Sequence, residues 1–233
     1  IGRLPTLSPP FVSADDAARF AHELIGDHRD CEYAGVILKN AEGRYFASRP
    51  EKVVGKKFKV TQFISSNASG QLIQPQGYTC QGFYNSRQHH LATEQKPFMG
   101  VTNDEVLFLA NFFLPEDIQA VLTMASFTSV HYLSGFNGSL LKVETRATAG
   151  ESQLYDFLAH DQEDHELLAE MIQFLKQVVA TLQVNIVQSA DIWKGTVGKL
   201  APEFFTTYRR AEVVEDMTVQ RPACGPLLDS EPL

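Results

Sequence analysis

The sequence lacks several features that would assign it to a class at once. Its three cysteines, Cys31, Cys80 and Cys224, lie far apart, and no CxxC motif occurs. This spacing is unlike a disulfide framework or a zinc knuckle, so we expect one or two buried thiols, which favour folding in a reducing environment. GxSxG, Walker and GxGxxG motifs are also missing, so the sequence carries none of these common hydrolase and nucleotide-binding signatures.

Positive charge is in short supply as well. The formal net charge is −8 at pH 7, and the isoelectric point is near 5.4. A nucleic-acid-binding surface needs basic side chains to neutralise phosphates, which argues against nucleic acid as the main partner. No apolar run approaches the length of a membrane-spanning helix, so we expect no membrane span.

What is present suits a folded domain. The chain has 233 residues, of which 44% are apolar, and it can bury a substantial core. After a proline-rich lead-in, residues 1–12, Ser13 is a good helix N-cap and Gly26 a good helix end. Apolar residues recur at helical spacing between them, which predicts a helix over 13–25.

The middle of the chain predicts a sheet. Two hairpins are expected, over 33–48 and 130–143, each with a turn that contains Asn and Gly. We expect a central strand over 77–81, an edge strand over 53–60 and a helix over 104–111. Pro115 stands where a helix favours proline, at its first position.

The last third of the chain predicts helices, over 151–160 and 163–182, with a broken helical region over 191–210. We therefore expect an α/β (α+β) fold, in which a central mixed sheet with flanking helices carries a C-terminal helical extension. The expected units are a lead-in linker (1–12), an α/β domain (13–147), the helical extension (148–210) and an irregular tail or linker (211–233). The proline-rich ends loosely resemble each other, so tandem copies in a parent chain stay open.

Polar residues cluster where the central strand is expected to end. Gly82 to Arg87 (GFYNSR) form this rim, and a polar loop with His89 and His90 follows it. Polar side chains at the end of a strand are a common setting for a binding site.

Three pieces of the sequence follow one another in a recognisable order: Glu32 before the strand Tyr33–Leu38, the stretch Gly82–Arg87, and Leu114–Ile118. Together they resemble a JAB/MPN domain. Gly82–Arg87 is similar to the family's Gly-Trp-Tyr-His-Ser-His, and Leu114–Ile118 is similar to its Ser-x-x-Asp followed by an aliphatic residue. The likeness covers about residues 13–145 and is nearest to a bacterial branch found at the C-termini of Rhs-type polymorphic toxins. It implies a cytidine-deaminase-like three-layer fold. In active members, two histidines and an aspartate hold zinc, a glutamate activates water, a serine helps to stabilise the oxyanion, and isopeptide or peptide bonds are cleaved.

This sequence departs from the family at the decisive positions. Asn85 and Arg87 stand where the two histidines would be, and Leu114 stands where the serine would be, so only Glu32 and Asp117 match. Arginine is permanently charged and does not ligate zinc. We therefore expect a metal-free, non-catalytic binding or scaffolding module of a larger bacterial protein. It would have no cofactor and an unknown protein partner, with Arg87 ion-paired to Asp117 or Glu32.

In that reading, the rim formed by Tyr84, Asn85, Arg87 and Asp117 is a polar pocket or contact surface. The resemblance leaves the location open between the bacterial cytoplasm and a secreted effector.

Other site readings stay open. The main alternative is a zinc-dependent (iso)peptidase-type hydrolase with a rearranged site. In it, Glu32 is the general base, and His89 and His90 hold the metal with Asp117 or His131 as the third partner. The segment His160–His165 has acid and histidine four residues apart, as a metal pair on a helix would, but we expect a solvated acidic helix start there, because no third ligand is evident. Cys80 could be a nucleophile beside the histidine loop, although a cysteine in a strand is more often a core residue.

Overall fold

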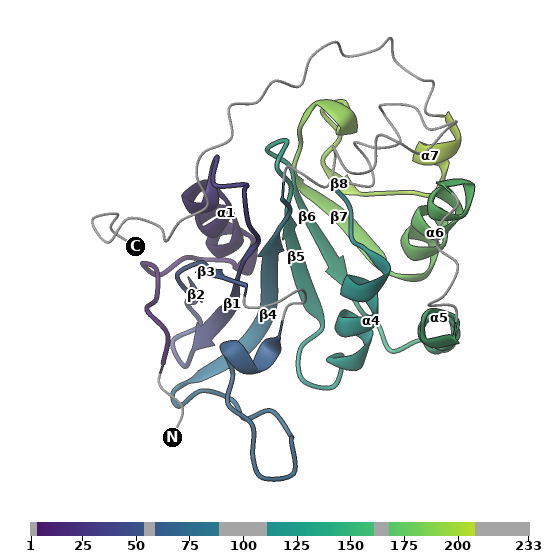
Figure 1. Ribbon diagram of the computed structural model, residues 1–233. Helices are drawn as coiled ribbons and strands as arrows, with labels where there is room; N and C mark the ends of the chain where they lie inside the picture. The colour runs from purple at the N-terminus through teal and green to yellow at the C-terminus, as the bar shows by residue number, and fades with distance from the viewer. Residues whose placement is uncertain (1–3, 54–58, 89–110, 161–167, 208–233) are drawn as a thin grey trace.

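The computed structural model describes residues 4–53, 59–88, 111–160 and 168–207. Within them, one mixed sheet holds eight strands, in the order β2-β1-β4-β5-β6-β7-β8 with β3 beside β1 (Figure 1). The strands are β1 (Tyr33–Asn40), β2 (Tyr45–Ala47), β3 (Glu51–Lys52), β4 (Tyr78–Ser86), β5 (Val130–Ser134), β6 (Leu140–Glu144), β7 (Gln183–Gln188) and β8 (Gly198–Lys199). Every pair is antiparallel except β4 and β5, which run parallel. The expected α+β class with a central mixed sheet is confirmed.

Helix α1 (Ala14–Ile25) covers one face of the sheet (Figure 1). It begins where the sequence predicts, because the Ser13 hydroxyl accepts a hydrogen bond from the Asp16 backbone N–H at 3.1 Å. It ends at Gly26, whose φ of +48° is a conformation that glycine adopts without strain. Its small buried residues Ala17 and Ala21 let the helix pack closely on the sheet.

The opposite face is covered by helices from the second half of the chain. They are α4 (Pro115–Thr123), α5 (Ala149–His160) and α6 (Leu168–Thr181), and the short helix α7 (Glu203–Thr207) packs beside α6. Their apolar side chains meet alternate residues of β5, β6 and β7, such as Leu133, Leu141 and Val184, in the largest hydrophobic cluster of the described residues. On the same face, the 3-10 helix η1 (Val60–Gln62) and the residues after it cover β1 and β4.

Both predicted hairpins are confirmed. β1 and β2 are joined by a turn in which the Asn40 side chain accepts from the N–H groups of Glu42 and Arg44. β5 and β6 are joined through the Asn-Gly turn, with Gly138 at φ +92°. Short, locally encoded turns of this kind are what a sequence pattern predicts best.

The last third of the chain differs from the prediction. Helices α5 and α6 lie where helices are expected, but residues 183–188 and 198–199 are strands that continue the same sheet. The prediction of a purely helical extension over 148–210 is therefore wrong for these residues. In β7, Val184 and Ile186 are buried on the helix-covered face and alternate with the polar Gln183 and Asn185. This strand period directly follows the α6 stripe.

Three local elements also differ from the prediction or lie partly outside the described residues. The edge strand expected over 53–60 is wrong where the structure describes it, because the strand β3 ends at Lys52 and Val60 lies in η1. The helix expected over 104–111 lies outside the described residues, apart from Asn111. The lead-in is extended as expected, but Leu7 and Phe11 form bridges with Ser48 and Tyr45 and so lie along the β2 edge.

The cysteines correct another expectation. Cys80 is a buried free thiol, as expected. Cys31 is disulfide-bonded, so the expectation of a reducing environment loses its support.

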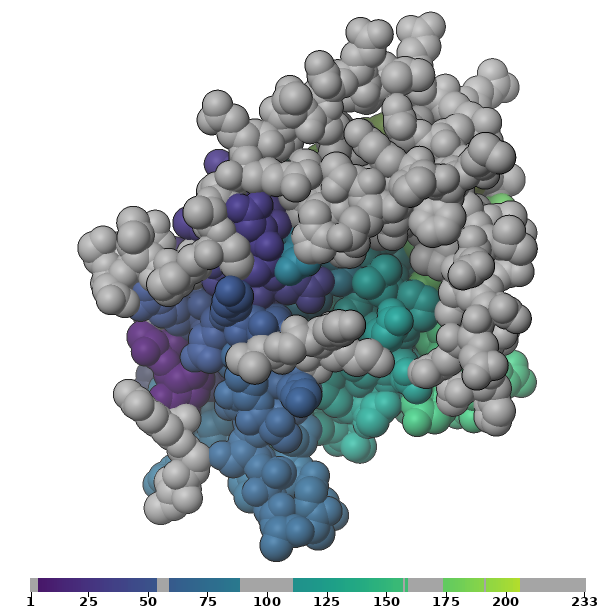
Figure 2. All heavy atoms as spheres, in the orientation of Figure 1, coloured from purple at the N-terminus to yellow at the C-terminus, as the bar shows by residue number. Residues whose placement is uncertain are grey.

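None of the described helices has the length and apolar character needed to cross a bilayer. The connection between η1 and β4, residues 63–77, projects from the body of the molecule (Figures 1 and 2). It carries Leu72, which lines a pocket beside β4 and α4.

One glycine of β1 is required by a close approach. Gly35 pairs with Tyr84 of β4, and the Tyr84 hydroxyl donates to the Ser48 carbonyl oxygen at 2.6 Å across the glycine. A Cβ on residue 35 would overlap the Tyr84 hydroxyl and lie 2.5 Å from the Ser48 Oγ.

We therefore expect Gly35→Ala to lower the free energy of unfolding by about 2 kcal/mol or more, because an overpacked buried site must shift. Chemical denaturation measures this change. The matched control is Gly150→Ala in α5, where the new Cβ meets its nearest neighbour at 3.5 Å, and where alanine is expected to be neutral or to stabilise by up to about 1 kcal/mol. Equal stability of Gly35→Ala and the wild type would contradict the packing described for β1.

Candidate functional site

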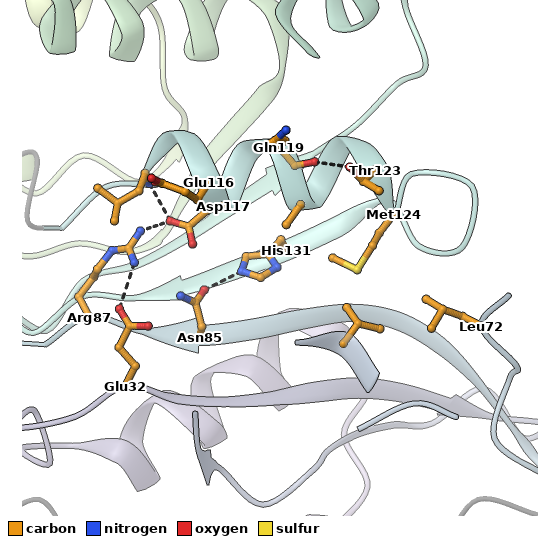
Figure 3. A pocket seen from close by; sticks show the side chains of 13 residues that line it. Glu32, Leu72, Asn85, Arg87, Glu116, Asp117, Gln119, Thr123, Met124 and His131 are labelled. Carbon is orange, nitrogen blue, oxygen red and sulfur yellow. Dashed lines mark hydrogen bonds and ion pairs between the residues drawn. The ribbon is translucent and has the colours of Figure 1, made fainter. Parts of the chain in front are cut away.

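A pocket of about 500 Å³ lies between the end of β4 and the first turns of α4 (Figure 3). Its volume falls in the range of small-ligand sites. The described residues that line it are Glu32, Val60, Leu72, Asn85, Arg87, Leu114, Glu116, Asp117, Gln119, Ala120, Thr123, Met124 and His131. The pocket thus brings together Glu32, Asn85, Arg87 and Asp117, which the sequence singles out from three separate stretches.

The strand β4 determines which predicted residues face the pocket. It extends through Ser86, beyond the expected end at Gln81, because its last residues pair with β1 on one side and β5 on the other. Asn85 and Arg87 are each only 1% exposed, so they line the floor of a pocket and do not form an exposed rim.

Tyr84 does not belong to this site. Successive strand residues point to opposite faces, and Tyr84 packs on the α1 face, where its hydroxyl donates to the Ser48 carbonyl oxygen. Its inclusion in the predicted rim is wrong.

Arg87 lies between two carboxylates, as Figure 3 shows. Its Nη1 donates to Glu32 Oε1 at 3.4 Å, and its Nη2 is ion-paired with Asp117 Oδ2. Nε and Nη2 also donate to the Phe112 carbonyl oxygen, at 3.3 and 3.1 Å. Burial lowers the pKa of Arg87, but the two carboxylates outweigh burial and raise it above its usual value. The expected ion pair is confirmed, and it involves both acids.

Asp117 has two roles at once. Its Oδ2 accepts from the Leu114 backbone N–H at 2.7 Å and so caps the N-terminus of α4. The same carboxylate pairs with Arg87. One side chain therefore stabilises the first turn of α4, as an acid in that position is expected to do, and also pairs with Arg87 in the pocket.

Glu32 is held just before β1, with its side chain 20% exposed. Burial raises its pKa; Arg87 opposes this shift and the negative charge of Asp117 adds to it. Glu32 therefore keeps a proton to higher pH than an ordinary glutamate does.

Asn85 and His131 form a second polar pair on the pocket floor. The Nε2 of His131 lies 2.6 Å from Oδ1 of Asn85. Burial lowers the pKa of His131 to about 4, with a further contribution from Arg87 and an opposing one from Asp117, so the imidazole is neutral at pH 7. The amide of Asn85 thus engages Nε2 of His131 on the pocket floor.

The described side chains do not fit a zinc site. No group of three or more His, Cys, Asp or Glu side chains in the described ranges is placed to hold a metal ion. Glu32 and Asp117, which would serve zinc chemistry, are both bound by N–H groups of Arg87. His89 and His90, the ligands of the alternative reading, lie outside the described residues, as does most of the segment His160–His165.

Cys80 is unlike a nucleophile. It is 4% exposed, and burial raises the pKa of its thiol to about 12, with a weaker opposing effect from its hydrogen bond to the Gly82 carbonyl oxygen. A reactive cysteine needs the opposite setting, exposed and electropositive.

Sequence reasoning missed a buried polar cluster on the other face of the sheet. Arg29, 5% exposed, donates to the Ser134 carbonyl oxygen at 2.8 Å and to the Ser134 Oγ at 2.9 Å. His22 lies between that same hydroxyl, at 2.6 Å, and the Gly138 carbonyl oxygen, at 2.9 Å. The one signal in the sequence is a histidine within the apolar stripe of α1.

The two clusters meet at Ser134, because the backbone N–H of Arg87 donates to the Ser134 carbonyl oxygen at 2.9 Å. Burial, helped by Arg29, lowers the pKa of His22 to about 4. The cluster therefore holds the end of β5 in place with a neutral imidazole and a buried guanidinium, directly behind the pocket.

Comparison of the chain with protein-family models, with curated proteins and with solved structures finds no match.

We expect Arg87→Met to lower the free energy of unfolding by about 3–5 kcal/mol, because two partly buried carboxylates lose their common counter-charge. The matched control is Arg19→Met, whose ion pair with Asp16 has side chains 40% and 37% exposed, so a loss within about 1 kcal/mol is expected. Urea denaturation measures both. Similar losses in the two variants would contradict the buried ion-pair arrangement.

The two buried histidines make stability depend on pH. Their folded-state pKa values, about 4, lie below the ordinary 6.5. Between these values the unfolded chain takes up protons that the folded chain does not, so stability falls as the pH falls from 6.5 towards 4.

We expect each histidine to contribute a loss of about 3 kcal/mol over this window. The variant His22→Gln, which keeps one donor and one acceptor, should therefore lose about 2–3 kcal/mol less than the wild type between pH 7 and pH 4.5. Denaturation midpoints at several pH values measure this difference. Parallel pH profiles for the two proteins would show that His22 does not titrate as described.

Proposed function

We propose that the chain is a metal-free, non-catalytic binding or scaffolding module of JAB/MPN-like fold, part of a larger bacterial protein, whose pocket takes part of a protein partner. The observation that carries the proposal is the position of the Arg87 guanidinium, paired with both Glu32 and Asp117. A fixed positive charge occupies the place where a zinc-dependent relative would need a cation held by histidines.

The arrangement of the resembling pieces supports the proposal. The likeness requires residues 32, 85, 87 and 117 to come together in space, and all four line one pocket. Asn85 and Arg87 keep the polar character of these positions but offer N–H donors in place of metal-ligating nitrogen lone pairs.

The proposal also agrees with the chemistry of the pocket acids. A general base for hydrolysis must be free to take a proton from water. Glu32 has one carboxylate oxygen bound by Arg87, and position 114 contributes a leucine where the family's serine would help an oxyanion. The zinc-dependent hydrolase with a rearranged site, using His89, His90 or Asp117, stays as the alternative that the experiment below tests.

We expect purified protein to contain zinc well below one ion per chain, and its melting temperature to be unchanged by a chelator. Elemental analysis and thermal unfolding measure these. Stoichiometric zinc, together with peptidase activity that Glu32→Ala abolishes, would overturn the proposal in favour of the hydrolase.

The double variant Asn85→His/Arg87→His is the matched control, because it restores the two histidines of the resembling motif beside Asp117. We expect it to bind zinc and to gain thermal stability on zinc addition, whereas the wild type does not respond. If the folded double variant ignores zinc, the alignment of Gly82–Arg87 with the family motif is wrong.

A further inference from the structure

The pocket has an excess of negative charge even with Arg87 in place. Glu32, Glu116 and Asp117 face it, and Arg87 is the one Lys or Arg among its described lining residues. The Arg87 guanidinium is already engaged by two carboxylates and the Phe112 carbonyl oxygen. One oxygen of Glu32 and one of Asp117 take part in none of the hydrogen bonds between described residues. The pocket therefore favours a ligand with a positive charge and several N–H donors.

An independent feature points to a ligand as well. Asn85 is 1% exposed, and its Oδ1 accepts a hydrogen bond from Nε2–H of His131. Its Nδ2 has no acceptor among the described residues, and Figure 3 shows this nitrogen directed into the space between Glu32 and Asp117. Asn85 lines the pocket, so this amide N–H is available to donate to a ligand oxygen.

The remaining wall of the pocket is mostly apolar, although Gln119 and Thr123 of α4 also line it. It is formed by side chains from η1, the projecting connection and α4, namely Val60, Leu72, Leu114, Ala120 and Met124. Together with a volume of about 500 Å³, this wall leaves room for an aliphatic side chain next to the polar floor.

From these three features we propose that the pocket binds the amino-terminal residue of a polypeptide. The α-ammonium group would donate to Glu32 and Asp117, the first carbonyl oxygen would accept from Asn85 Nδ2, and an aliphatic first side chain would pack on the apolar wall. Capture of a chain terminus by fixed charges and hydrogen-bonding groups is a known mode of peptide recognition. This inference rests on the proposed function, because it names the ligand of the same pocket.

Other ligand chemistries match fewer of these groups. A simple alkylamine would leave the Asn85 N–H without an acceptor, and an anion would meet the excess of carboxylates. A free amino acid shares the ammonium and the carbonyl carbon, but its carboxylate would lie close to these acids. The structure therefore favours a peptide, in which that carboxylate is replaced by a neutral amide.

The test is titration of the wild-type protein, by calorimetry and by NMR, with small probes. We expect leucinamide and the peptide Leu-Ala-Ala-amide to bind, with the peptide at least as tight. N-acetyl-leucinamide, which lacks the positive charge, should bind about tenfold more weakly or not at all. Isopentylamine, which lacks the carbonyl group, should also bind several-fold more weakly than leucinamide.

Three outcomes would overturn the inference. The first is that the acetylated probe binds as tightly as leucinamide. The second is that free leucine binds more tightly than the peptide, which would indicate a free amino acid as the ligand. The third is that neither leucinamide nor the peptide binds. In each case a low zinc content leaves the proposed metal-free module standing. Stoichiometric zinc with Glu32-dependent peptidase activity would instead remove the proposed function itself.

Variants separate the site from general electrostatic attraction. Glu32→Gln keeps an oxygen for Arg87 but removes one charge, and it is expected to weaken peptide binding about tenfold. The matched control Glu23→Gln makes the same chemical change at an exposed position of α1, on the opposite face of the sheet, and should leave binding unchanged. Thermal unfolding of each variant confirms that the folded protein is being titrated, and equal effects of the two substitutions would contradict the proposed contacts.

Discussion

The buried guanidinium of Arg87 is the constraint on which the rest of the pocket depends. A permanent charge that is 1% exposed must be paired, because it cannot lose its proton and an unpaired buried charge is very costly. Arg87 meets this need with Glu32, from the start of β1, with Asp117, from the start of α4, and with the Phe112 carbonyl oxygen. One side chain thereby fixes the relative positions of three segments that are distant in the sequence.

Buried pairs of this kind are weak evidence for stability in themselves, since desolvation offsets much of the attraction. What they fix well is position. On the other face of the sheet, Arg29 and His22 hold Ser134 in the same manner, and the Ser134 carbonyl oxygen is shared between Arg29 and the backbone of Arg87. The pocket floor is therefore held from both faces, which is the arrangement expected of a preorganised binding site.

Sequence reasoning succeeds here where the information is local. Ser13 and Gly26 bound α1, Pro115 begins α4, and the Asn-Gly turn joins β5 to β6, each through contacts within a few residues. The approach of Arg87 to Asp117 is a long-range contact, and it is predicted because the resemblance to a known domain places the two positions together.

The failures have physical causes that are equally specific. β7 is missed because its period of two, at Val184 and Ile186, directly follows the long helical stripe of α6. Tyr84 is placed on the wrong face because the stretch after Gln81 is expected to leave the sheet, whereas pairing on both sides keeps it in the strand. The cluster of Arg29, His22 and Ser134 depends on tertiary contacts between residues more than 100 positions apart, which no local pattern contains.

Among the described strands, β4 and β5 form the one parallel pair, and this pairing affects cooperativity. On one side of it, β1 to β4 pair among themselves in antiparallel fashion, and on the other side β5 to β8 do the same, so β4 and β5 form a seam between two locally built halves. Glu32 and Asn85 come from the first half. Asp117 comes from the residues that lead into the second half, and His131 comes from the second half itself. The pocket therefore exists only while the halves are joined. By linkage, any molecule bound in the pocket raises the free energy needed to separate the two halves. Binding to the pocket and separation of β4 from β5 are therefore thermodynamically coupled.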